Sequence, residues 1–350
     1  MKIQLFTVLA IFSFILPISS IAQDIFQEGD RLFTTEELQA QILNTSKRKI
    51  TIKSSAQLSG KMEITTESGS AVTAQYFKKS RTDSESNAID YIDLIAVSIV
   101  EKPEEILILF RAPNPAPWSK ETESGIVELY LQIPPYSEVE IEARYFDISA
   151  VGPFKSFILP ASLGRIEVEN VNGYLEAGTT NQKLSLKNIT GEIKVSTTNG
   201  KLVAENIKSP DSQAYFKNDG GDILIRNFEG LLNVRNNYGR ISIVEFVAGR
   251  GKNFVRGFSA PVIIEIEKMS NTELTVLNRF EDIEILLPEN VSASFSLAVE
   301  EGNRIEATSF EFKPEFVQKN RLNIVAGKGE SSINSTIRGK GNIYIIGVGN

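Results

Sequence analysis

One short apolar pattern recurs four times between Leu163 and Phe246, and it constrains the fold more than any other feature of the chain. The first apolar residue of each copy follows the previous one by 18, 18 and 21 residues, and a three-residue insertion around Ser209 and Pro210 aligns the last two apolar positions of the copies as well. One such unit cannot bury its apolar face alone, so a period near 20 residues predicts a solenoid of stacked turns, or rungs. The five apolar columns are Ile166, Leu184, Leu202 and Ile223; Val168, Leu186, Ala204 and Ile225; Val171, Ile189, Ile207 and Phe228; Leu175, Ile193, Ala214 and Leu232; and Ala177, Val195, Phe216 and Val234.

Asparagine and glycine mark the corners of each copy. An asparagine occupies one equivalent bend in all four copies, where stacked amides are expected to form a hydrogen-bonded ladder. Glycines follow, because tight corners need a positive backbone φ. The asparagines are Asn170, Asn188, Asn206 and Asn227, and the glycines are Gly173, Gly191 and Gly230, with Asn199, Gly200, Gly220, Gly221 and Gly239 on the opposite side.

The flanking segments alternate apolar and polar residues with a period of two, which predicts strands from Lys49 to the C-terminal Ile343 and Ile345. The polar stretch Lys78–Ala88 is expected to be a solvated loop, and the next strand to start near Ile92. The repeat degrades after Phe246, where its fourth apolar slot falls on Arg250. The fold class is therefore all-β, a parallel β-solenoid with about 18 to 22 residues per turn, capped by its terminal units.

The N-terminal part divides into a leader and a short connecting segment. Lys2, the apolar run Leu5–Ile18 and the small residues up to Ala22 predict a secretory signal peptide cleaved after Ala22. In the following segment, Thr34 and Glu37 precede helically spaced apolar residues, which predicts either one short capped helix or an irregular first rung.

The expected organisation is thus a signal peptide at 1–22, an N-terminal segment at 23–48, a β region at 49–160 leading into the solenoid, and solenoid repeats with a C-terminal cap at 161–350. After removal of the leader we expect no transmembrane segment. We expect the protein in the periplasm, at the outer membrane or outside the cell.

Composition excludes several function classes. The chain of 350 residues has no Cys and no His, which excludes thiol nucleophiles, disulfides, the usual zinc ligands and the commonest general base. A formal charge of −7 gives no reason to expect a nucleic-acid partner. We expect no cofactor and no metal.

The runs Gly164–Gly173, Leu184–Gly191 and Asp282–Pro288, with the strand Val127–Pro134 before the repeats, resemble the bacterial putative adhesin family. That family comprises envelope proteins of unassigned molecular function, related to the head domains of putative autotransporter adhesins. The resemblance extends from Lys49 to Ile346 and implies a right-handed solenoid, but it transfers no catalytic positions.

Two aspartates are the candidates for carboxylate chemistry. Asp219 and Asp222 flank a glycine pair, with Arg226 close in sequence, and one interpretation is that they meet at a corner as a glycan-cleaving site. The alternative, which we favour, is that they are turn formers. A calcium site at the asparagine column is a weaker hypothesis than a structural ladder, because amides alone bind the ion poorly.

Binding candidates are basic and aromatic. Five cations surround the point where the repeat degrades, and they form either a binding surface for an acidic glycan or lipid head group, or a solvated corner that prevents end-to-end stacking. Trp118, on a proline-rich loop, either stacks on sugar or packs against a rung. The five cations are Arg235, Arg240, Arg250, Lys252 and Arg256.

The sequence favours a secreted, non-enzymatic scaffold of the adhesin type, with an extracellular glycan or an envelope protein as its partner. A carbohydrate-active β-helix enzyme, a polysaccharide lyase or hydrolase, is the alternative, and a periplasmic partner in envelope sensing is a third interpretation.

Overall fold

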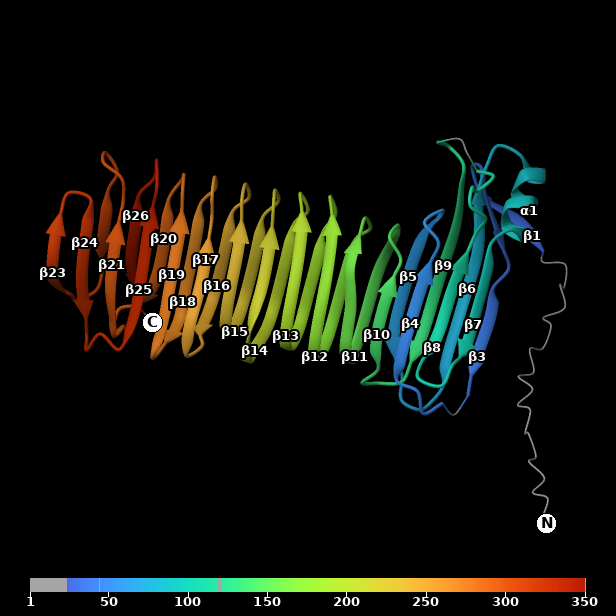
Figure 1. Cartoon of the computed structure of the whole chain (residues 1–350), viewed down its shortest axis with the longest axis horizontal. Helices are drawn as coiled ribbons and strands as arrows, with labels where there is room; N and C mark the ends of the chain where they lie inside the picture. The colour runs from blue at the N-terminus through green and yellow to red at the C-terminus, as the bar shows by residue number, and fades with distance from the viewer. Residues whose placement is uncertain (1–23, 44, 119–120, 350) are drawn as a thin grey trace, which may run out of the picture.

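Hydrogen bonding between successive repeats builds one long, mostly parallel sheet. The computed structural model describes residues 24–43, 45–118 and 121–349, so the predicted signal peptide lies outside the described residues. Within these ranges the chain forms twenty-six strands and one helix. Figure 1 shows an elongated stack whose N-terminal end carries α1 (Glu85–Asp93) and whose C-terminal end carries β23 (Lys313–Gln318).

The central strands pair in the register that the repeat predicts. Ile166 pairs with Leu184, Leu184 with Leu202, and Leu202 with Ile223, all in parallel. All twenty residues of the five apolar columns are at most 2% exposed, so the column alignment is confirmed. The strands are β12 (Ile166–Thr180), β13 (Leu184–Thr198), β14 (Leu202–Asn218) and β15 (Ile223–Asn236).

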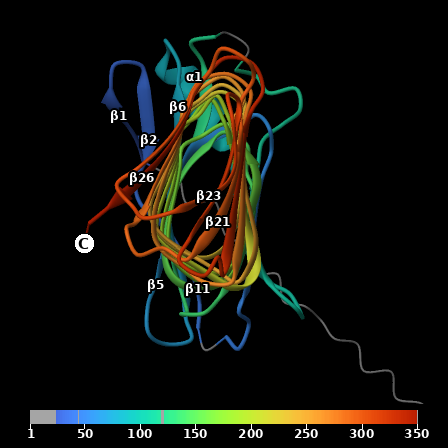
Figure 2. The same cartoon turned by 90° about the vertical axis from the view of Figure 1, so that its left-hand side faces the viewer.

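Each central strand bends near its asparagine and so contributes to two walls. The end-on view shows the stacked turns as one narrow closed outline (Figure 2). We call the stacked first halves of the strands the first wall and the second halves the second wall. The walls meet at the asparagine edge, where the strands bend, and at the turn edge, where one strand ends and the next begins. A single apolar cluster fills the interior from Ile50 to Ile345.

The asparagine edge carries the predicted ladder. Asn170, Asn188, Asn206 and Asn227 have φ angles of 61°, 54°, 56° and 52°. The amide nitrogens of Asn188, Asn206 and Asn227 each donate to the asparagine side-chain oxygen of the preceding rung, at 3.1, 3.0 and 2.9 Å. Asparagine suits this position because it tolerates the left-handed conformation and satisfies its side chain locally.

The glycines serve two different purposes. At the asparagine edge Gly173, Gly191 and Gly230 have the expected positive φ. At the turn edge the requirement is close approach: a Cβ on Gly200 would lie 1.8 Å from the carbonyl oxygen of Gln182 on the preceding rung. A Cβ on Gly239 would likewise lie 2.0 Å from the carbonyl oxygen of Gly221.

The repeat extends further at both ends than its sequence pattern indicates. β11 (Phe146–Ser162) pairs with β12 at Ile148 and Ile166, so the rungs begin before Leu163. After Phe246 the fourth slot is filled by Asn253, not Arg250, because this rung is three residues longer. Buried Asn253 accepts the Leu232 N–H at 2.8 Å and donates to the Gly249 carbonyl at 3.2 Å, so its polar groups are paired.

Near the N-terminus the rungs do not stack in chain order. β4 lies between β8 and β10, and β5 lies between β9 and β11, all in parallel. The chain thus builds an outer rung, β8–β9, before it returns to continue the stack. The bounds are β4 (Lys49–Ser54), β5 (Leu58–Thr66), β8 (Ile106–Arg111), β9 (Ser124–Ile133) and β10 (Glu138–Glu142).

Antiparallel strands cover this end. The short helix and the irregular rung predicted around Thr34 are both wrong, since the segment forms three strands. Antiparallel pairing joins β1 to β2, β2 and β3 to β6, β6 to β9, and β7 to β8, which overrides the weak helical pattern. The strands are β1 (Ile25–Gly29), β2 (Leu32–Thr35), β3 (Leu38–Ile42), β6 (Val72–Arg81) and β7 (Ala96–Glu101).

The helix lies where a solvated loop was predicted. Ser84 caps α1 by accepting the Asn87 N–H, and Ala88 and Ile92 are buried beside Phe33. Ala88, Tyr91 and Ile92 are buried at helical spacing, β6 extends to Arg81 and the next strand begins at Ala96. The predictions of a loop over Lys78–Ala88 and of a strand that starts near Ile92 are therefore both wrong. Among the described residues no helix has the length and apolar character needed to cross a membrane.

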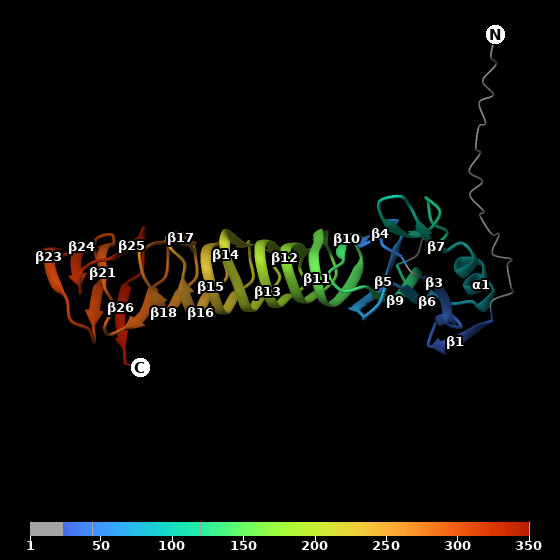
Figure 3. The same cartoon turned by 90° about the horizontal axis from the view of Figure 1, so that it is seen from below.

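The C-terminal strands are interleaved in the same way. β25 lies between β19 and β21, and β26 lies between β20 and β22, all in parallel. The antiparallel pair β23–β24 closes the end (Figure 3). The predicted strands are present, but not stacked in chain order. The bounds are β16 (Ile241–Ala248), β17 (Gly251–Arg256), β18 (Val262–Met269), β19 (Thr272–Asn278), β20 (Ile283–Pro288), β21 (Ala293–Ala298), β22 (Ile305–Thr308), β24 (Arg321–Ala326), β25 (Ser331–Ile337) and β26 (Ile343–Val348).

Candidate ligand-binding groove

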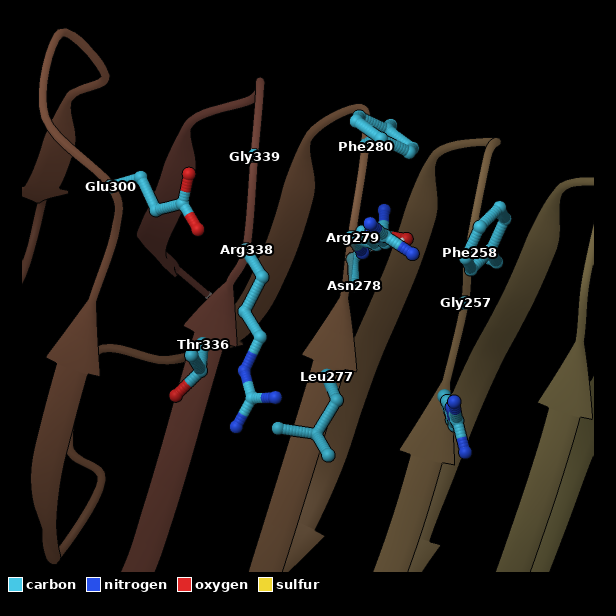
Figure 4. A pocket seen from close by; sticks show the side chains of 11 residues that line it. Gly257, Phe258, Leu277, Asn278, Arg279, Phe280, Glu300, Thr336, Arg338 and Gly339 are labelled. Carbon is cyan, nitrogen blue, oxygen red and sulfur yellow. Dashed lines mark hydrogen bonds between the residues drawn. The ribbon is translucent and has the colours of Figure 1, made fainter.

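A groove of about 620 Å³ lies where the second wall meets the turn edge, across β17, β19 and β25 (Figure 4). Arg256, Arg279 and Arg338 line it, with Glu300 on the side toward the C-terminal end. The interleaving of β25 brings this site together: β25 pairs with β19, and the Arg338 N–H bonds the Asn278 carbonyl at 3.0 Å. Arg338 therefore lies beside Arg279, although the two are far apart in sequence.

Aromatic rings on successive turns form the outer rim. The ring centroids of Tyr238 and Phe258 are 6.2 Å apart, and those of Phe258 and Phe280 are 5.7 Å apart, both pairs edge to face. The Arg279 guanidinium lies 5.3 Å from the centroids of both Phe258 and Phe280. Such cation–π contacts hold the guanidinium in place while it keeps its full charge.

The groove stays open beside Phe280 because the neighbouring position, two residues after β25, is Gly339, which has no side chain. Gly339 lines the hollow with φ 96°, and a Cβ there would lie 2.9 Å from the Phe280 ring. Any larger residue at 339 would therefore press against the ring. Phe280 and Tyr238 are 38% and 63% exposed, so their rings are available to a ligand.

The arginines of the groove lack carboxylate partners. Lys187, Lys194 and Lys208 elsewhere on the stack form ion pairs at 3.6, 2.7 and 3.0 Å. In contrast, no described residue forms an ion pair with Arg256, Arg279 or Arg338. With Glu300 as its one acidic lining residue, the groove therefore carries an excess of positive charge on a chain whose formal charge is −7.

The five cations predicted to form a basic corner do not form one cluster. Arg235 and Arg256 are register neighbours on the second wall, and Arg256 lines the groove. Lys252 and Arg250 lie at the other end of β17, where Lys252 is 4.0 Å from Glu273. Arg240 directly precedes β16, which belongs to the first wall. Of the five cations, Arg235 and Arg256 are therefore the two that lie side by side.

The remaining groove residues were missed by sequence reasoning. Tyr238, Phe258 and Phe280 follow one another by 20 and 22 residues, close to the rung period, and this spacing was a usable signal. Arg338 had no such signal, because only the interleaved pairing of β25 brings it to Arg279.

The two candidate aspartates bind neighbouring turns. Asp222 accepts the backbone N–H of Arg240 on the next rung at 3.0 Å, and Asp219 accepts the Asn237 amide. Arg226 lies in register beside Glu205 on the first wall. Asp282, nearer the C-terminal end, binds a neighbouring turn in the same way: its side-chain oxygen accepts the backbone N–H of Asn342 at 2.7 Å. The turn-former interpretation of the aspartates is thus the one that the contacts favour.

Trp118 and the asparagine column also have structural partners. The Trp118 indole N–H donates to the Gln57 carbonyl at 3.0 Å, and its ring packs edge to face on Tyr91 at 5.7 Å. At the asparagine edge the amide oxygens of Asn170, Asn188 and Asn206 each accept from the next rung. Among the described residues, no group of three or more acidic side chains is placed to hold a metal ion.

No protein-family model matches the sequence, and no curated protein matches it. Solved structures do match. A putative cell adhesion protein from Clostridium sporogenes shares 14% identity over 89% of this chain and 99% of its own, with a TM-score of 0.23. Putative adhesins from Parabacteroides merdae and Bacteroides fragilis share 11% and 8%, over 89% of this chain and 96% and 97% of their own, with TM-scores of 0.38 and 0.27.

These structural neighbours are bacterial proteins described as putative adhesins or cell adhesion proteins, in agreement with the resemblance of the sequence motifs. At such identities and TM-scores the likeness concerns the fold alone. It carries no information about a ligand, and the candidate groove is argued from the residues of this chain.

Proposed function

We propose that the protein is an exported, non-enzymatic β-solenoid that acts as an adhesin-like scaffold and presents a binding surface to a glycan or an envelope protein. The observation that carries this proposal is the groove with three unpaired arginines and exposed aromatic rings on an otherwise regular stack. Regular scaffolds commonly carry binding at such local irregularities.

The proposed architecture has finer features. The turns coil in a right-handed sense with about 18 to 22 residues each. Residues 49–160 lead into the repeats of 161–350, and both share the apolar interior. The leader 1–22 is removed on export, and the protein acts in the periplasm, at the outer membrane or outside the cell. The adhesin names of the structural neighbours agree with an envelope location.

Binding is favoured over catalysis because the candidate carboxylates already serve the fold. Most glycoside hydrolases use two carboxyl groups that face the substrate. Asp219 and Asp222 instead bond Asn237 and Arg240 on the next turn. In the groove the acidic residue is Glu300, opposite three arginines.

The experiment combines binding and activity. Purified protein lacking the leader is added to envelope fractions and cells of the source organism, and separately to a panel of acidic polysaccharides assayed for new chain ends. Retention on envelope material without polysaccharide cleavage is the expected result. Cleavage that is lost in Asp222→Asn would overturn the proposal in favour of an enzyme, and absence of retention would overturn the scaffold function.

A further inference from the structure

We propose that the groove of Arg256, Arg279, Arg338, Phe258 and Phe280 binds an anionic polysaccharide. The inference rests on the proposed binding function and specifies its ligand class. Two chemical requirements meet at this one place: cations that recognise carboxylate or sulfate groups, and aromatic faces that recognise sugar rings.

The arginines define the charge of the ligand. A guanidinium group presents planar, paired donors that match a carboxylate or sulfate group, and it cannot lose its proton at physiological pH. Three such groups line the groove, with only Glu300 as a counter-charge. Figure 4 shows the Arg338 side chain extending along β25 between Thr336 and Leu277, which also line the hollow.

The aromatic rim defines the second property of the ligand. Phenylalanine and tyrosine rings offer apolar faces, on which the C–H face of a sugar ring packs. Phe280 is partly exposed at the groove, and Gly339 leaves the space beside its ring free of side chains. Poly-L-glutamate would use the arginines but has no ring to place on Phe280.

The surface beyond the groove indicates a polymer. Lys217, Arg235 and Arg256 are register neighbours on adjacent strands of the second wall, so a row of cations runs along the stack into the groove. The Arg235 guanidinium lies 5.9 Å from the Tyr215 ring and 5.6 Å from the Phe254 ring. Because adjacent strands are about 4.8 Å apart, the row offers a charged track along several rungs.

The test measures binding of four probes to the whole protein lacking its leader: polygalacturonate, neutral dextran, poly-L-glutamate and vesicles with anionic lipid. We expect polygalacturonate to bind most tightly, and the binding to weaken with salt because exposed charges are screened. Equal or tighter binding of dextran, poly-L-glutamate or vesicles would overturn the proposal, since each lacks one of the two required features.

Substitutions at exposed positions locate the site. Arg338→Gln and Arg256→Gln should each weaken polygalacturonate binding about tenfold, because each removes charge-assisted hydrogen bonds. Glu300→Gln should strengthen it, and Phe280→Ala should weaken it without changing the salt dependence. The matched control, Lys201→Gln, removes an exposed cation that directly precedes β14 and does not line the groove, and it should leave affinity unchanged.

The melting temperature of each variant is measured in parallel, so that loss of binding is separated from loss of fold. Unchanged binding in both arginine variants, or weaker binding in Glu300→Gln, would overturn the groove as the site. If the doubly reversed variant Arg256→Glu, Arg338→Glu keeps its retention on envelope material, this inference fails while the proposed scaffold function stands.

Discussion

The side-chain amide of Asn206 donates a hydrogen bond of 3.0 Å to the side-chain oxygen of Asn188 on the preceding rung, and both residues have a positive φ. Asn227 donates in turn to Asn206 at 2.9 Å. One residue type thus meets two requirements at each bend: it tolerates the left-handed backbone and links its rung to the next.

Replacing Asn206 separates these two requirements. Asn206→Ala loses both ladder bonds and places a Cβ-bearing, non-polar residue at φ 56°, so we expect it to lower the free energy of unfolding by about 2 kcal/mol. Asn206→Gly loses the same bonds but still tolerates the left-handed backbone conformation, so it should lower the free energy of unfolding by less. Urea unfolding of both variants measures the difference; equal losses would show that backbone conformation contributes nothing.

The ladder ends at Glu245, which offers a stabilising substitution. Arg226 and Phe228 pair with Val244 and Phe246, so Glu245 occupies the bend that Asn227 occupies on the preceding rung. Its φ is 56°. Glu245→Asn should extend the ladder and relieve an unfavourable backbone conformation, raising the free energy of unfolding by about 1 kcal/mol. Glu245→Gln removes the charge but not the conformational cost, so it should gain less. An unchanged melting temperature for Glu245→Asn would contradict the ladder account.

The turn-edge glycines allow a test of close approach. A Cβ on Gly200 would meet the Gln182 carbonyl at 1.8 Å, whereas one on Gly29 would meet nothing within 4 Å. We expect Gly200→Ala to lower the free energy of unfolding by about 3 kcal/mol, since both groups are backbone and cannot yield cheaply. Gly29→Ala, the control, should be close to neutral. Similar stabilities for the two variants would mean that the rungs can separate at this edge.

The regular interior of the stack was predictable from sequence, and its ends were not. A residue such as Leu184 meets its counterparts one period away, so local spacing carries the information. At the ends, pairs such as Ile50 with Ile106, or Leu277 with Thr336, join segments separated by an intervening hairpin or excursion. No period in the sequence encodes such interleaving. The groove could not be predicted for the same reason, because Arg338 lies beside Arg279 only as a result of the pairing of β25 with β19.

Two adjacent lysines near α1 should respond oppositely to substitution. Burial lowers the pKa of Lys78 below the usual 10.5, with Asp93 acting the other way, and its Nζ donates to the Ile92 carbonyl at 3.2 Å. Because the folded protein holds this proton less tightly than the unfolded chain, stability should rise as the pH climbs through the folded-state pKa toward 10.5. Lys78→Met should stabilise the protein at neutral pH and reduce this rise.

Lys79 is the matched control. Burial lowers its pKa, but the carboxylates of Glu28 and Glu128, at 2.7 and 3.0 Å, more than offset this, and the net pKa is raised. Its contribution is therefore present at neutral pH and lost only above the usual lysine range. Lys79→Met should lower stability at neutral pH and keep the alkaline rise. Urea unfolding across this pH range measures the stability of both variants. An alkaline rise that persists in Lys78→Met would contradict the assignment of this rise to Lys78.

Ile193 tests the stacked interior itself. It is fully buried, pairs with Leu175 of the preceding rung, and belongs to the continuous apolar cluster. Ile193→Asp places a charge where no partner or water can compensate it, so we expect a loss of several kcal/mol and local unfolding of the adjacent rungs. Because each rung is stabilised mainly by its neighbours, hydrogen exchange should report lost protection in β12 to β14 before β19 and β25. Thr198→Asp, exposed on the same strand, should change stability little; equal effects of the two substitutions would mean that residue 193 does not face the interior.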